Sequence, residues 1–81
     1  MRIEVVGDGH VFQGTPQQIL MQMKSLAFGA ENMSMREYIE GNVANIARGV
    51  GITFKLTGET DEDLAVSFLK QMLDGGYARR L

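Results

Sequence analysis

Few side chains of this sequence could carry chemistry near neutral pH, because the chain has one histidine and no cysteine. His10 follows Gly7-Asp8-Gly9, beside a predicted turn. A lone imidazole can act as an acid or a base, but catalysis needs partner groups in a fixed arrangement, and the spacing implies none. We therefore expect His10 to be an ordinary solvent-facing residue beside a turn.

Two other groups of residues could in principle bind a ligand. Gly7-Asp8-Gly9 would need a glycine at position 12 to match the dinucleotide fingerprint, and that position is Phe12. The acidic residues of 59–63 lack the EF-hand spacing and fit the start of a helix, where the macrodipole favours negative charge. The sequence thus predicts no catalytic residue, no metal site and no cofactor, and favours a protein that is not an enzyme.

Composition indicates one ordinary globular domain. The chain has 81 residues, of which 44% are hydrophobic and 22% are charged. Its formal charge of −2 gives no general attraction to nucleic acid or to anionic lipid. We therefore expect residues 1–81 to form a single domain for which nucleic acid is not the default partner.

The sequence also bears on location. Glu4 and the predicted turn at 7–9 leave no room near Met1 for the apolar run of a signal peptide. No apolar run approaches the length needed to span a membrane. We expect a cytoplasmic protein with no membrane contact.

The elements that must position any site begin with a hairpin, predicted over residues 2–14. Residues 2–6 alternate, and Asp8-Gly9 is a favoured pair for a tight type I′ turn. This turn would place Val5 opposite Phe12, with Ile3 on the same apolar side.

Two helices are predicted next, over residues 16–28 and 35–48. Thr15-Pro16 is typical of a helix start, and Ser34 with Glu37 forms a capping box. Glycines at 49 and 51 end the second helix. Apolar residues recur at helical spacing along both segments.

The last third of the chain is predicted to hold a strand over 52–57 and a helix over 61–74. Ile52, Phe54 and Leu56 alternate with polar residues, which is typical of a strand with one wet face. Thr60 caps the helix that follows, and residues 75–81 are expected to form a short tail. The order is therefore ββααβα, and we predict a two-layer α+β domain in which three helices pack on one face of a small three-stranded sheet.

Surplus apolar residues suggest a contact surface. The chain has six methionines, and several of them have no clear place in the core, although Met35 also belongs to the apolar stripe of its helix. Met21 and Phe28, seven residues apart, would share a second apolar face of the first helix. The candidate interface consists of Met21, Phe28, Met33, Met35, Tyr38, Gly41 and Asn45.

One flank of the second helix is poorly shielded, because Gly41, Asn45 and Gly49 recur every four residues. Glycine within a helix is costly, so we expect another element to approach closely there. We expect that element to be another helix of this chain, and a symmetric helix pair across a dimer is the alternative. The leading functional hypothesis is a small non-catalytic protein–protein interaction module, expected to form a homodimer.

DNA binding is the alternative hypothesis. The order of elements from His10 to Gly49 resembles that of the ribbon-helix-helix repressors, over about half of the chain. The resemblance implies that Val11 and Gln13 would be the outward strand residues. The candidate phosphate contacts would be Arg36, Arg48, Arg79 and Arg80.

Overall fold

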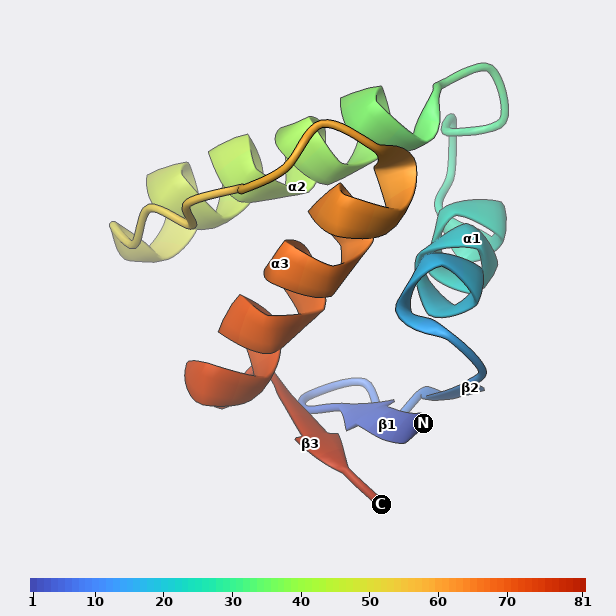
Figure 1. Cartoon of the computed structure of the whole chain (residues 1–81). Coiled ribbons are helices and arrows are strands. Elements are labelled where there is room, and N and C mark those ends of the chain that lie inside the picture. The colour runs from blue at the N-terminus through green and yellow to red at the C-terminus, as the bar shows by residue number, and fades with distance from the viewer.

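The computed structural model describes all 81 residues as one α+β domain, and this confirms the predicted fold class. Three helices and a three-stranded antiparallel sheet are present (Figure 1). Along the chain the elements are β1 (Arg2–Val5), β2 (Val11–Gln13), α1 (Pro16–Leu26), α2 (Met35–Val50), α3 (Asp61–Asp74) and β3 (Ala78–Arg80).

The predicted hairpin is present, but its register differs by two residues. Ile3, not Val5, lies opposite Phe12. A type I′ turn would need positive φ at Asp8, and no residue other than glycine has positive φ in this structure. Gly7 and Gly9 take the positive φ values of 109° and 76°, so the loop is longer than a two-residue turn. Because a shift of two residues preserves the faces, Ile3 and Phe12 are still buried together.

The third strand is not the one that the sequence predicts. Residues 52–57 lie outside the sheet, and β3 comes from residues 78–80 of the predicted tail. The sheet order is β2-β1-β3, with Glu4 of β1 opposite Arg79 of β3. Both ends of the chain therefore meet at the sheet (Figure 1).

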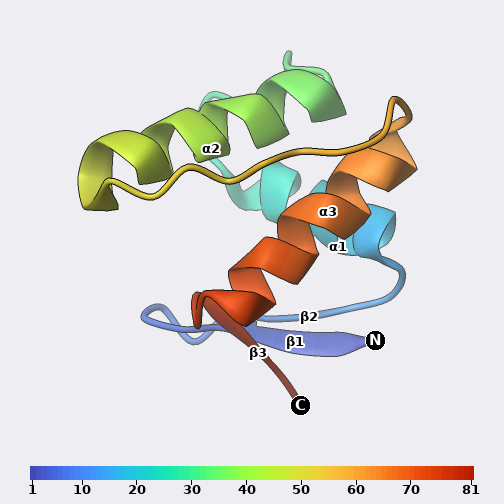
Figure 2. The same ribbon diagram turned by 60° about the vertical axis from the view of Figure 1, so that its left-hand side comes forward.

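The helices lie on one side of the sheet, in two tiers. α1 packs on β2, α3 packs on β3, and the two helices pack against each other. α2 packs on α1 and α3 rather than on a strand, and Figure 2 shows it on the far side of these helices from the sheet. The chain that leaves α2 therefore begins in the outer tier, which explains why residues 52–57 do not join the sheet.

One apolar core links the sheet, the three helices and the segment 52–57. Ile3 and Ile19 are fully buried, and so are Ile39 and Ala65. Phe54 contributes from the extended segment, where its ring lies 5.6 Å from that of Phe68. The full set of clustered residues is Ile3, Phe12, Ile19, Leu20, Met35, Ile39, Phe54, Leu64, Ala65, Phe68, Leu69, Met72 and Ala78.

All three helices begin with a capping box, as the sequence predicts for Ser34. The side-chain oxygens of Thr15, Ser34 and Thr60 each accept a hydrogen bond from the backbone N–H three residues later. In return, the side chain of the third residue of each helix accepts a hydrogen bond from the backbone N–H of the capping residue. These local signals fix where each helix starts.

The helix ends differ more from expectation than the starts. α1 stops at Leu26 instead of residue 28, and α2 continues to Val50 instead of residue 48. α3 occupies residues 61–74, as predicted. Gly51, at φ 74°, ends α2 in the left-handed conformation, and its N–H donates to the Ala47 carbonyl.

Candidate interaction surfaces

The loop between α1 and α2 carries the most exposed aromatic residue of the chain. Phe28 has a relative exposure of 107%, the value of a side chain that nothing covers. The loop itself is anchored, because Ala30 is buried and its N–H donates to the Ala27 carbonyl at 3.3 Å. The apolar ring therefore stands out from a structured turn.

Other apolar side chains of α1 and this loop are also exposed. Because α1 ends at Leu26, Phe28 stands outside the helix and does not share a helical face with Met21, contrary to expectation. We call these exposed apolar residues of α1 and the loop the Phe28 surface: Met21, Leu26, Phe28 and Met33.

Two predicted interface residues contribute to the core instead. Met35, the first residue of α2, is 8% exposed, so it is not available to a partner. Tyr38 is half-buried and packs against the core, and this burial raises the pKa of its phenol above the ordinary 10.0. The apolar stripe of the second helix, to which Met35 also belongs, predicted its burial correctly.

The small-residue flank of α2 is open. Gly41, Asn45 and Gly49 are all exposed, and no atom would lie within 4 Å of a Cβ added at either glycine. The expectation that another helix of this chain packs closely there is wrong. α2 packs on α1 and α3 with a different side, which carries the buried Met35 and Ile39.

An apolar groove lies between α2 and the extended segment 52–58. Its volume is about 480 Å³. Its lining residues are Arg36, Glu40, Val43, Ala44, Ala47, Phe54, Leu56, Gly58 and Leu64. The sequence analysis did not find this groove, because it took the segment for a strand of the sheet.

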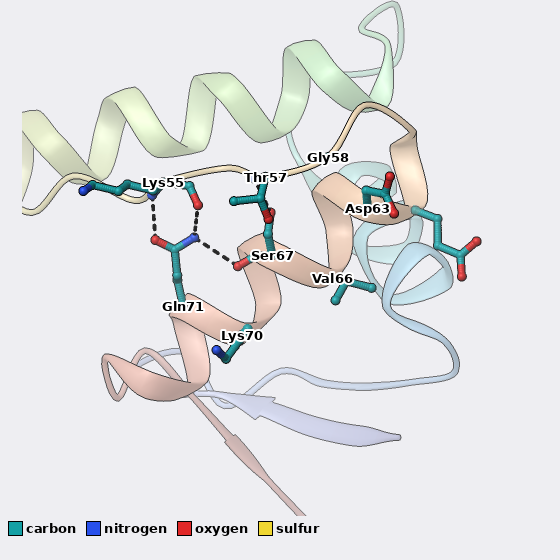
Figure 3. A pocket seen from close by; sticks show the side chains of 9 residues that line it. Lys55, Thr57, Gly58, Asp63, Val66, Ser67, Lys70 and Gln71 are labelled. Atoms are coloured by element: carbon teal, nitrogen blue, oxygen red, sulfur yellow. Dashed lines mark hydrogen bonds between the residues drawn. The ribbon is translucent and has the colours of Figure 1, made fainter.

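α3 holds the same extended segment from its other side. The Gln71 side chain accepts a hydrogen bond from the Lys55 N–H and donates one to the Lys55 carbonyl, both at 2.6 Å (Figure 3). Ser67 Oγ accepts from the Thr57 N–H at 3.3 Å. Around these bonds lies a polar hollow of about 560 Å³, whose rim includes Lys55, Lys70 and Glu62. The Gln71 side-chain amide in this hollow is already hydrogen-bonded to the Lys55 backbone.

The hairpin loop brings Asp8 and His10 together. Asp8 Oδ1 lies 3.3 Å from His10 Nδ1 and accepts the His10 backbone N–H at 2.9 Å. The bond from this backbone N–H is the main cause that lowers the pKa of the Asp8 carboxyl. Both side chains are more than half exposed, beside a shallow hollow of about 230 Å³ that Tyr38 also lines. The contact arises within one tight loop.

The four arginines proposed as phosphate contacts are divided between two elements, α2 and β3. Arg36 donates to the Glu59 carbonyl at 2.7 Å and lies 3.9 Å from Glu40. Arg48 donates to the Asn45 side chain, and Arg79 bonds Glu4 at 2.6 Å. Arg80 is exposed on β3. Three of the four are thus bonded within the chain. Arg36 and Arg48 lie near opposite ends of α2.

The acidic residues at the start of α3 do not gather into a cation site. Asp63 closes the capping box with Thr60, and no group of three or more His, Asp or Glu side chains is placed to hold a metal ion. No helix combines the length and the apolar character that a bilayer crossing requires.

Comparison of the chain with protein-family models, curated proteins and solved structures finds no match. The geometry of the chain itself therefore carries the functional argument.

Proposed function

We propose that this chain is a small non-catalytic protein–protein interaction module that associates with itself. The observation that carries the proposal is Phe28, an aromatic side chain fully exposed on an anchored turn. Burial of such a side chain contributes about 1.5–3 kcal/mol, and aromatic residues dominate the contacts that hold interfaces together. Met21, Leu26 and Met33 supply further exposed apolar area on the same part of the chain.

Light scattering and sedimentation over a wide range of protein concentration test this proposal. We expect the wild-type chain to form dimers as concentration rises, and Phe28→Asp to stay monomeric with an unchanged circular dichroism spectrum. Val66→Asp is the matched control, because Val66 is an exposed apolar residue of α3, away from the loop. A wild-type chain that stays monomeric at millimolar concentration, or a Phe28→Asp variant that dimerises like wild type, would refute the proposal.

DNA binding is less well supported. β2 has the exposed Val11 and Gln13 that the ribbon-helix-helix resemblance requires, but the arginines do not form a single basic surface. A gel-shift series at low salt with random duplex DNA is the direct test, and retardation would favour this alternative. The cytoplasmic location stays a prediction of the sequence.

A further inference from the structure

The segment 52–58 has the properties of a strand without a strand partner. Phe54 is buried and Leu56 half-buried, while Thr53, Lys55 and Thr57 are exposed, so residues 53–57 alternate as a strand does. Ile52, at the start of the segment, is exposed. The side chains of Phe54 and Leu56 pack into the core, but the backbone of the segment is not part of the sheet.

Only one edge of this segment is hydrogen-bonded. The backbones of Lys55 and Thr57 face α3, where Gln71 and Ser67 bind them. In an extended chain, the N–H and C=O groups of successive residues point to opposite edges. Those of Phe54 and Leu56 therefore point away from α3, and neither residue makes a backbone hydrogen bond within the chain.

The unpaired edge borders the apolar groove. Phe54 and Leu56 form one wall of the groove, and Val43, Ala44 and Ala47 of α2 form the other. The two alanines present little more than methyl groups, which leaves space beside the backbone. The groove thus combines apolar lining with hydrogen-bonding groups at the spacing of a strand.

We propose that this groove binds one extended peptide of a partner protein, which adds as a strand to the unpaired edge of residues 52–57. Strand addition satisfies the backbone groups of Phe54 and Leu56, and alternate apolar side chains of the peptide fill the groove. This surface lies apart from the Phe28 surface and does not depend on self-association.

Two features favour a single extended peptide over a second folded copy of this chain. α2 runs beside the segment (Figure 2), so whatever pairs with the segment also lies next to a helix. A single strand adds at a spacing of about 4.8 Å and is the smallest element that can pair there. Arg36 and Glu40 at the rim lie 3.9 Å apart and offset each other's charge. The rim of the groove therefore offers no net charge to attract a strongly charged partner, and the apolar lining favours a strand with apolar side chains on one side.

A synthetic peptide with the sequence of residues 50–58 serves as the probe, because it alternates apolar and polar residues and readily extends. Hydrogen exchange followed by NMR is the readout. In the free protein we expect the Phe54 and Leu56 amides to exchange faster than the Lys55 amide, which donates to Gln71. Saturation with the peptide should slow exchange at Phe54 and Leu56 by about tenfold or more, and leave Lys55 nearly unchanged.

Two protein variants and one peptide variant sharpen the test. Ala44→Arg fills the groove and should weaken peptide binding by about tenfold or more. Asn45→Arg places the same charge on the next residue of α2, outside the groove, and should bind like wild type. A peptide N-methylated at two adjacent central amides keeps its side chains but loses donors on both edges, and it should not bind.

The opposite results would overturn the proposal. They are an absence of protection at Phe54 and Leu56, equal binding by the Ala44→Arg and Asn45→Arg variants, or equal binding of the N-methylated peptide. Pairing of two protein chains through residues 52–57, seen as dimerisation that the peptide inhibits, would also overturn it. Phe28→Asp should bind the peptide normally, which separates this outcome from that of the proposed self-association.

Discussion

At the scale of single residues, the Gln71 side chain holds the segment 52–58 against α3. Its amide satisfies both backbone groups of Lys55 at 2.6 Å, in the way that a neighbouring strand would. It also donates to the Ser67 carbonyl one turn earlier, at 3.1 Å, which restrains the side chain on α3. One glutamine therefore replaces part of a missing strand.

Gln71→Leu should lower the free energy of unfolding by about 1–3 kcal/mol, because it leaves the Lys55 backbone without its partner. Urea denaturation measures this loss, and faster exchange of the Lys55 amide locates it. Gln17→Leu is the control, since the Gln17 side chain makes no hydrogen bond in the structure. Equal stabilities of the two variants would contradict the role given to Gln71.

The Glu37 carboxylate makes the start of α2 sensitive to pH. Bonding by the Ser34 backbone N–H lowers the pKa of Glu37 below its ordinary 4.5. A pKa lowered in the folded state means that the stabilisation is fully present above pH 4.5 and is lost as the pH falls through the folded value.

Glu37→Gln should therefore be less stable than wild type at neutral pH, and the difference should vanish on acidification through the folded pKa. Urea titrations over this pH range measure it. α1 offers the reciprocal variant, because Gln18 occupies the same position in its capping box. Gln18→Glu should acquire the pH dependence that Glu37→Gln loses, and a difference that stays constant with pH would contradict this account.

At the scale of the elements, one glycine inside α2 and the glycine that caps it have opposite roles. Gly41 lies within the helix with open space around it, whereas Gly51 ends the helix at φ 74°. No atom lies within 4 Å of a Cβ added at either position, so only backbone conformation distinguishes them.

Gly41→Ala should stabilise the protein by about 0.5–1 kcal/mol, because alanine is the better helix former. Gly51→Ala should destabilise it by about 1–2 kcal/mol, because a Cβ is strained in the left-handed conformation. Thermal unfolding of both variants provides the comparison. If both variants lost stability, helix propensity would not be what decides the effect at Gly41. A contact that the isolated chain does not show would then account for the glycine there.

An element could be predicted from the sequence when the residues that specify it lie close together along the chain. Ser34, Thr60 and their partners three residues later act within one helical turn, so the sequence predicted the helix starts and α3 in full. The alternation of residues 52–57 predicted a strand of the sheet, which is wrong. Phe54 is buried as that pattern requires, but Ile52, expected on the same side, is exposed. The pattern did not reveal what Phe54 packs on, because packing on α3 buries Phe54 as packing in a sheet would.

At the scale of the whole molecule, three features depended on the tertiary arrangement: the strand β3, the groove beside α2 and the exposed position of Phe28. Ala78 is the only buried residue of β3, so the sequence of the tail gave no alternating signal for a strand. The place of β3 beside β1 follows from the position of α3. α3 packs on β3, and the chain that leaves α3 reaches the edge of the sheet.

The pairing of β1 with β3 has a consequence for chain connectivity. The two strands are antiparallel neighbours, and the Leu81 N–H donates to the Arg2 carbonyl at 3.0 Å. They are therefore equivalent to a hairpin whose connecting turn is absent. The contact between Glu4 and Arg79 spans 75 positions of sequence, so forming it carries a larger loop-closure entropy cost than forming the β1–β2 hairpin.

A circular permutant would supply that turn. Joining residue 81 to residue 1 through a short glycine-rich linker, and opening the chain after Glu31 in the exposed part of the α1–α2 loop, would turn the β1–β3 contacts, the most distant of the molecule, into some of its most local. We expect the permutant to keep the fold and to refold faster in stopped-flow experiments. An unchanged refolding rate would mean that the sheet edge closes only after the rate-limiting step.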